Sequence, residues 1–176
     1  PSATFTGLGY VTTNNTVKFN GTGTQFIPAL RTTNPYNNLT ISGGSTKTLS
    51  SAVTVGTAAA GVLTLNGGIL ELDAYNLTLA NTTTAPLSGS FSSTNMISTN
   101  GAGYLQRNGS AAAHYQITYP LGSGGNYSPM IISSIAAVFP TYIRVKAVPT
   151  AINPSYIKKY WDVQSNIALT SVTATF

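Results

Sequence analysis

The residues that most often carry acid–base or metal chemistry are scarce in this chain. Its 176 residues include three carboxylates, Glu71, Asp73 and Asp162, and one histidine, His114. Glu71 and Asp73 are two positions apart, so on a strand they would share a face and could bind Ca²⁺ or serve as the acid–base pair of a lyase. Ca²⁺ usually takes about six to eight oxygen ligands. Because no further carboxylate lies nearby in the sequence, we favour two exposed charges that keep an outer face soluble.

The sequence supports nucleophilic catalysis no better than it supports acid–base catalysis. Ser110, His114 and Asp162 could in principle form a triad, but the chain has no G-x-S-x-G nucleophile elbow. The glycine-rich stretch GSGGN at 122–126 lacks the lysine and the following helix of a phosphate loop, so we predict a hairpin tip there. Without cysteine, neither disulfides nor thiolate metal sites are possible. The sequence predicts no catalytic residue, no metal site and no cofactor, and hence a protein that is not an enzyme.

An aromatic cluster is the first candidate for binding. Tyr156, Tyr160 and Trp161 lie beside Lys158 and Lys159. The rings could stack on the faces of sugars, which would make this segment a glycan-binding module. The alternative is that alternate members of the cluster pack into a core while the lysines lie on the other face.

Threonine in a repeated pattern is the second candidate. The form apolar-Thr-apolar recurs around Thr40, Thr54, Thr64 and Thr78. Successive side chains on a strand point to opposite faces, so if the flanking Leu, Ile and Val fill an interior, these threonines point outward and form an uncharged hydroxyl face. Regular threonine ladders suit ice binding, but the spacing here is irregular.

The elements that position these residues are predicted to be short strands. In the first part they fall at 16–20, 24–30, 37–42, 47–56, 62–66, 69–73 and 76–80. These strands are too closely spaced for crossover helices, so parallel pairing would require the chain to coil, with two or three strands in each turn of a solenoid. A meander sandwich is the alternative. The reuse of apolar-Thr-apolar favours the solenoid.

The pattern changes after the small-residue run near 107–114. Longer strands are predicted at 114–122, 128–139, 141–148, 157–163 and 168–176, separated by Gly, Pro and Asn, which is typical of an antiparallel sandwich. We therefore predict an all-β chain with a β-solenoid over 1–110 and a small antiparallel β-sandwich over 111–176.

Composition narrows the class of protein further. Charged residues make up 6% of the chain, against roughly 25% in an average soluble protein. The net charge of +5 comes from eight scattered Lys and Arg residues, without the basic stripe of a nucleic-acid binder. No apolar run approaches the roughly 20 residues of a membrane-spanning helix. We expect an extracellular or cell-surface protein that binds no nucleic acid and does not cross a membrane.

Several weak motifs, taken in order, resemble a known group. They are VKFNGTGTQFIPAL, NPYNNLTISGGSTKTLSSAVTV, GVLTLNGGILELDAYNLTLA, GAGYLQRNGS, YPLGSGGNYSPMII and YWDV. Together they resemble the β-rich modules of large secreted or surface proteins of Bacteroidetes, including gliding-adhesin-like proteins exported by the type IX system. The resemblance implies a right-handed parallel β-solenoid followed by a β-sandwich, carried outside the cell. No recognisable type IX sorting domain follows Phe176, so either a longer precursor has been trimmed or this chain is a piece of a larger one.

These observations lead to a non-catalytic structural or adhesive surface protein, with a self-assembling filament or sheath subunit as one form. Neutral faces pack closely because no charge must be desolvated. The expected partners are other copies of the chain, other cell-surface proteins or glycans. A glycan- or surface-binding module of a larger secreted protein is the alternative, and an enzyme comes third.

Overall fold

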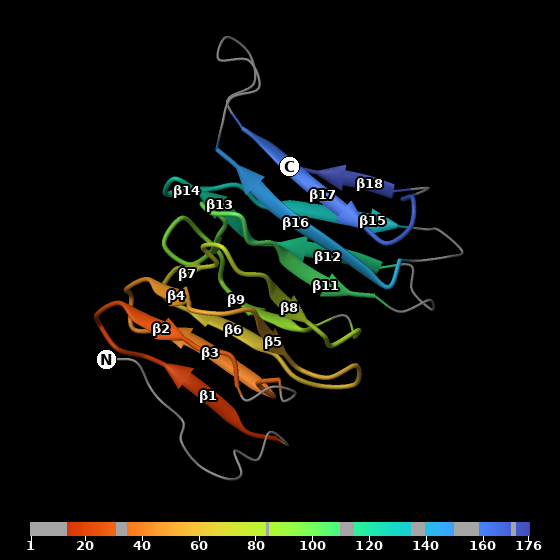
Figure 1. Ribbon diagram of the computed structural model, residues 1–176. Helices are drawn as coiled ribbons and strands as arrows, with labels where there is room; N and C mark the ends of the chain where they lie inside the picture. Colours follow the sequence, from red (N-terminus) through yellow and green to blue (C-terminus); the bar gives the residue numbers. More distant parts are fainter. Residues whose placement is uncertain are drawn as a thin grey trace.

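The computed structural model describes residues 14–30, 35–83, 85–109, 115–134, 140–149, 159–169 and 172–176, and in these ranges the chain consists of strands and turns without a helix. The strands form four sheets (Figure 1), named A to D here. Sheet A contains, in spatial order, β1 (Thr16–Phe19), β3 (Asn38–Ser42), β6 (Leu63–Asn66) and β9 (Leu87–Gly89). Sheet B contains β14 (Asn126–Tyr127), β13 (Leu121–Ser123), β10 (Ile97–Ser98), β7 (Leu70–Glu71), β4 (Lys47–Leu49) and β2 (Gln25–Ile27). Sheet C contains β17 (Tyr160–Ser165), β16 (Tyr142–Val148), β11 (Leu105–Asn108), β8 (Leu77–Leu79) and β5 (Val53–Val55), and sheet D contains β12 (Tyr115–Tyr119), β15 (Met130–Ser134) and β18 (Val172–Thr175).

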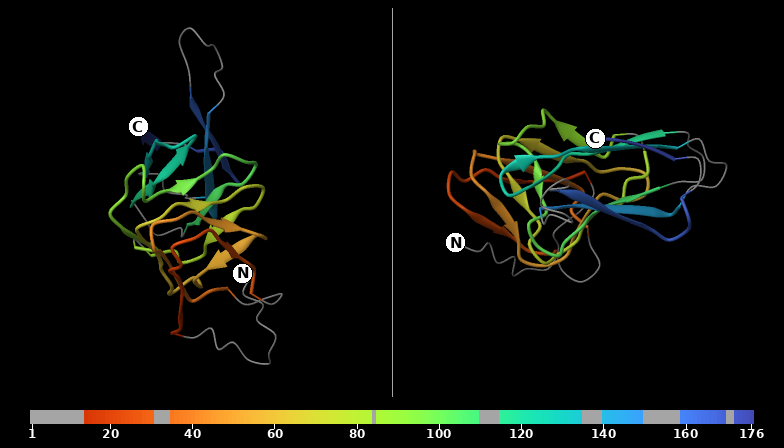
Figure 2. Two further views of the ribbon diagram at one scale, coloured as in Figure 1. Left: turned by 90° about the vertical axis from the view of Figure 1, so that its left-hand side faces the viewer. Right: turned by 90° about the horizontal axis from the view of Figure 1, so that it is seen from above.

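Sheets A, B and C are built by a chain that coils. The second coil contributes β3, β4 and β5 to the three sheets, the third contributes β6, β7 and β8, and the fourth contributes β9, β10 and β11. Strands of neighbouring coils pair in parallel within each sheet. The predicted parallel β-solenoid is therefore confirmed, with about four coils stacked one above another (Figure 2).

Like residues stack on like residues inside the solenoid. Leu39 and Leu63 are in register in sheet A, and Val53, Leu77 and Leu105 are in register in sheet C; all five are buried. Full burial of such a side chain contributes about 1.5–3 kcal/mol. The period-two pattern of the sequence therefore becomes a continuous column of apolar contacts along the axis.

Glycine makes the corners between sheets possible. Gly67 and Gly68, at the corner between β6 and β7, have φ angles of 86° and 136°, which glycine adopts without strain. At Gly61 (φ 103°) an added Cβ would lie 2.4 Å from the carbonyl oxygen of Asn37, in the coil before it. The coils approach each other so closely at this corner that only glycine fits.

The strand boundaries differ from the prediction in three places. The expected strand at 47–56 is two strands, β4 and β5, with a corner between them. The fourth coil, β9 to β11, was not among the predicted strands at all. The expected strand at 114–122 is interrupted by Pro120 and becomes β12 and β13, because proline has no N–H to donate to a ladder.

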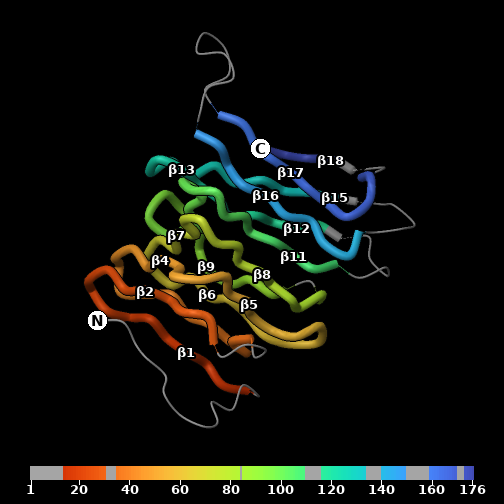
Figure 3. The backbone as a smooth tube through the Cα atoms, viewed as in Figure 1, coloured from red at the N-terminus to blue at the C-terminus, as the bar shows by residue number. Residues whose placement is uncertain are grey.

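Some of the C-terminal strands extend the sheets of the solenoid, and the others form the separate sheet D (Figure 3). Strand β13 extends sheet B in parallel with β10, whereas β16 and β17 extend sheet C as antiparallel strands beside β11. Sheet D packs against this extension, where the hydroxyl of Tyr119 donates to the carbonyl of Ile143 at 3.0 Å. A separate antiparallel sandwich is thus not confirmed, since the described strands after residue 110 are shared among three sheets.

Candidate functional site

Exposed charge is nearly absent from the solenoid coils. Residues 35–83 and 85–109 contain four charged residues, and two of them, Lys47 and Arg107, are buried with 0% and 4% of their surface exposed. The remaining two, Glu71 and Asp73, lie two residues apart, at the end of β7 and in the turn after it. In the first coil Lys18 on β1 is exposed as well, and the rest of the described coil surface presents hydroxyl, amide, backbone and apolar groups.

Lys47 shows how a cation is accommodated inside the solenoid. It occupies the inward row of sheet B, in register with Gln25 and Leu70. Its Nζ donates to the carbonyls of Gly21, Ser45 and Gly23 at 2.8, 3.2 and 3.3 Å. Desolvation lowers the pKa of Lys47, while the three carbonyls stabilise its ammonium form. The residue therefore ties the corner of the first coil to the second and carries no charge to the surface.

The four candidate threonines lie on two different faces. Thr40 and Thr64 are in register in sheet A, followed by Ser88. Thr54 and Thr78 are in register in sheet C. Each threonine is exposed or half-buried between buried neighbours. Their side chains therefore point outward, as two separate rows and not as one face.

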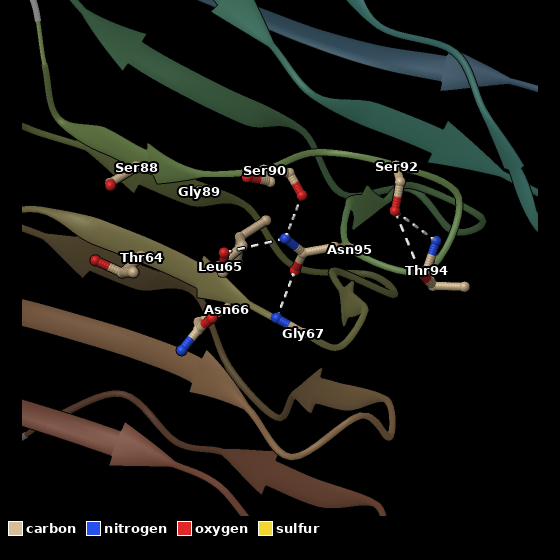
Figure 4. Close-up of a pocket in the computed structure, with 10 residues that line it drawn as sticks. All are labelled: Thr64, Leu65, Asn66, Gly67, Ser88, Gly89, Ser90, Ser92, Thr94 and Asn95. Carbon is tan, nitrogen blue, oxygen red and sulfur yellow. Dashed lines mark hydrogen bonds between the residues drawn. The ribbon is translucent and has the colours of Figure 1, made fainter.

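A hollow of about 650 Å³ opens on sheet A where β6 and β9 end (Figure 4). Its polar lining comes from Thr64, Asn66, Ser88, Ser90, Ser92 and Thr94. Ser92 and Thr94 bond to each other at 3.2 Å. The other four side chains have no hydrogen-bond partner among the described residues. The hollow thus offers neutral donors and acceptors to a ligand.

Asn95 holds the wall of this hollow in place through three hydrogen bonds. Its Nδ2 donates to the carbonyls of Ser90 and Leu65 at 2.7 and 3.0 Å, and its Oδ1 accepts from the N–H of Gly67 at 3.1 Å. Figure 4 shows the three bonds: two join Asn95 to Leu65 and Gly67 at the end of β6, and the third, to Ser90, lies within the loop after β9. One buried amide therefore holds the wall of the hollow against the coil below.

The outer face of sheet C carries a connected polar network. The hydroxyl of Tyr104 donates to Oδ2 of Asp162 at 2.5 Å and accepts from Nε2 of Gln164 at 2.8 Å. Arg144 donates from Nε and Nη2 to Oε1 of Gln164 at 3.0 and 2.6 Å. Both Arg144 and Lys146 lie over the Tyr104 ring, each 4.9 Å from its centroid. Burial raises the pKa of Tyr104 to about 12, and the hydrogen bond to Asp162 and its negative charge add to the rise.

The predicted aromatic cluster is not a single platform. Tyr160 and Trp161 are consecutive on β17 and point to opposite faces. Trp161 packs against the core, donates from Nε1 to the carbonyl of Ser128 at 3.1 Å and stacks on Phe176. Tyr160 lies on the outer face, on the side of Asp162. Tyr156 lies outside the described residues.

The carboxylates considered for acid–base or metal chemistry lie in different parts of the structure. Glu71 accepts from Nδ2 of Asn100 at 2.9 Å, whereas Asp162 belongs to the network on sheet C. Within the described ranges no three His, Cys, Asp or Glu residues gather where they could hold a metal ion. Ser110 and His114 lie outside those ranges. The residues of the hollow and of the network were missed because they come from different coils, and the sequence contains no local motif that joins them.

The chain matches no family model, and no curated protein or solved structure is significantly similar to it. In the part of the chain that the structure describes, no helix has the length and apolar character needed to cross a bilayer.

Proposed function

We propose that this chain is a non-catalytic structural or adhesive protein of an extracellular surface that associates with copies of itself or with neighbouring surface proteins. The observation that supports this function is the scarcity of exposed charge on the coils: Lys47 and Arg107 are buried, so Glu71 and Asp73 are the only charged residues left outside over 35–83 and 85–109. Right-handed winding and export by the type IX system, implied by the resemblance, remain part of the proposal.

A neutral β surface favours association because its burial desolvates no charge. Thr40, Thr64 and Ser88 form one such row, which has Lys18 of β1 at its other end. The strand at the neutral end, β9, pairs only with β6 among the described residues. Edge strands that avoid pairing usually carry lysine, proline or a bulge. Strand β9 has the residues Leu-Ser-Gly and no charge, so it supports contact with a partner.

The test is the particle mass in solution, measured by sedimentation or light scattering from low to high salt. The parent chain should associate at high concentration with weak dependence on salt, because screening acts on exposed charges and few are present. Thr64→Lys should reduce association by placing like charges across the contact, and the matched Thr64→Ser should not. A strictly monomeric parent would count against polymerisation, and an assembly that dissolves in moderate salt would assign the contact to basic residues instead.

The hollow on sheet A favours a second candidate function, the binding of a neutral glycan. The unpartnered side chains of Thr64, Asn66, Ser88 and Ser90 match the hydroxyl groups of a sugar in hydrogen-bonding type and lack of charge. A glycan array tests this function. Asn66→Ala should abolish any neutral-glycan signal that depends on the hollow, whereas Thr40→Ala, on the same sheet outside it, should leave the signal unchanged.

A further inference from the structure

The outer face of sheet C differs from the neutral faces described above. Two cations, Arg144 and Lys146, alternate along β16 and lie over one ring, Tyr104. Asp162 lies opposite Lys146 in the antiparallel register. The group therefore combines two positive charges with one negative charge, beside coils whose surface is almost uncharged.

The carboxylate of Asp162 is already engaged by neutral donors. Its Oδ2 accepts from the hydroxyl of Tyr104, and its Oδ1 accepts from Nε2 of Gln164 at 3.3 Å. Lys146 has the Tyr104 ring as its contact and no hydrogen-bond acceptor among the described residues. An ammonium group has three N–H donors, so those of Lys146 are available to an incoming anion.

Arg144 is held in a fixed orientation. Two of its five N–H donors, on Nε and Nη2, bond to Oε1 of Gln164. The remaining donors of its planar fork suit a carboxylate. Because Gln164 and Tyr104 hold the guanidinium in place, little side-chain entropy is lost when a ligand binds.

Neutral hydrogen-bonding groups continue this face toward the solenoid. Thr54, Thr78, Gln106 and Arg144 are in register across β5, β8, β11 and β16. On the other side, Tyr160 shares the outer face of β17 with Asp162 and Gln164. A ring, two cations and a row of hydroxyl and amide groups are together suited to a ligand with sugar rings, hydroxyls and negative charge.

We propose that this face of sheet C binds a carboxylate-bearing polysaccharide, with Arg144 and Lys146 contacting the carboxylate and the row from Gln106 to Thr54 contacting sugar hydroxyls. The inference rests on the proposed adhesive role, since it specifies the class of surface to which the chain would adhere. A phosphate polymer such as nucleic acid fits less well, because it requires a longer series of cations.

The test measures the affinity of the whole chain for polygalacturonate, with dextran, polyglutamate and duplex DNA as comparison polymers. Polygalacturonate should bind most tightly. Arg144→Gln combined with Lys146→Gln should weaken that binding by about tenfold or more, because charge-assisted hydrogen bonds are lost. Lys146→Gln alone, which breaks no hydrogen bond within the protein, should weaken it by about threefold and keep the parent melting temperature.

The matched control is Lys18→Gln combined with Lys159→Gln, which removes the same charge away from this face: Lys18 lies on sheet A, and Lys159 donates to Ser128. The control should retain affinity within about twofold. Equal losses in the two double variants would assign binding to net charge and overturn the inference, as would equal affinity for polyglutamate or DNA. If polygalacturonate does not bind while the parent chain still associates in sedimentation, the inference fails and the proposed function stands.

Discussion

Replacement of Asn95 by alanine tests whether one buried amide holds the fourth coil to the third. Asn95 is 7% exposed and makes three hydrogen bonds to backbone groups, at 2.7, 3.0 and 3.1 Å. Each such bond contributes about 1 kcal/mol net, and a buried group left without a partner costs about 1–3 kcal/mol. We expect Asn95→Ala to lower the free energy of unfolding by about 2–4 kcal/mol. In a chain of this length that corresponds to a decrease in melting temperature of about 5–15 °C.

Denaturant and thermal unfolding measure this effect, with Asn66→Ala as the control. Asn66 lines the same hollow but is exposed and has no hydrogen-bond partner among the described residues, so its replacement should change the free energy of unfolding by less than about 0.5 kcal/mol. If Asn95→Ala were as stable as Asn66→Ala, the role assigned to Asn95 would be wrong.

A second variant at the same position adds a test by pH. In Asn95→Asp a carboxylate oxygen would face the carbonyls of Leu65 and Ser90 in place of the Nδ2 donor. Burial and these carbonyls would raise its pKa in the folded state above the unfolded value of about 3.9. The destabilisation should therefore be present at neutral pH and decrease as the pH falls toward 4. The parent chain has only three carboxylates, so its own stability should change little over this range.

Three further predictions concern the core, the loss of stability at alkaline pH, and catalysis. Leu65→Asp should unfold the solenoid, because it buries an unpaired charge at a cost of several kcal/mol, whereas Thr64→Ser should change the melting temperature little; similar melting of the two variants would contradict the assigned inward and outward directions. The pKa of Tyr104 is raised to about 12 in the folded state. The contribution of the protonated Tyr104 hydroxyl to stability should therefore be complete below pH 10 and decline as the pH rises toward 12. When the free energy of unfolding is measured against pH, this part of the decline should be absent in Tyr104→Phe. Glu71→Gln and His114→Ala should leave any enzymatic activity of the purified chain unchanged, and an activity lost in either variant would overturn the non-catalytic assignment.

Local pattern alone predicted the class of fold and much of the first three coils. Strict alternation around Leu63, Leu65, Leu77 and Leu79 specifies which side chains face inward, because the period of a strand is two. The corner at Gly67 was predictable for a similar reason, since glycine tolerates positive φ. These features depend on neighbours in sequence, so no knowledge of distant contacts was needed.

The fourth coil could not be predicted in this way. Strands β9 and β10 have the sequences Leu-Ser-Gly and Ile-Ser, so each contains one large apolar residue and neither shows the apolar-Thr-apolar alternation of β5, β6 and β8. They exist because β6 and β7 below them provide parallel partners in register. Backbone hydrogen bonds to the strands of the previous coil compensate for the weak intrinsic preference of these residues for strand. This compensation is a tertiary effect.

The candidate sites were decided by stacking. Alternation shows that Thr54 and Thr64 point outward, but which sheet each belongs to depends on how many residues each corner contains, and the structure places them on different faces. Burial of Lys47 likewise depends on three carbonyls, two of them from the preceding coil. Charge and hydrogen-bonding capacity were therefore determined by the sequence itself. The tertiary structure alone decides which of these groups face solvent and which meet across coils. The reason is that contacts between residues about two dozen positions apart are set by the register of the whole stack.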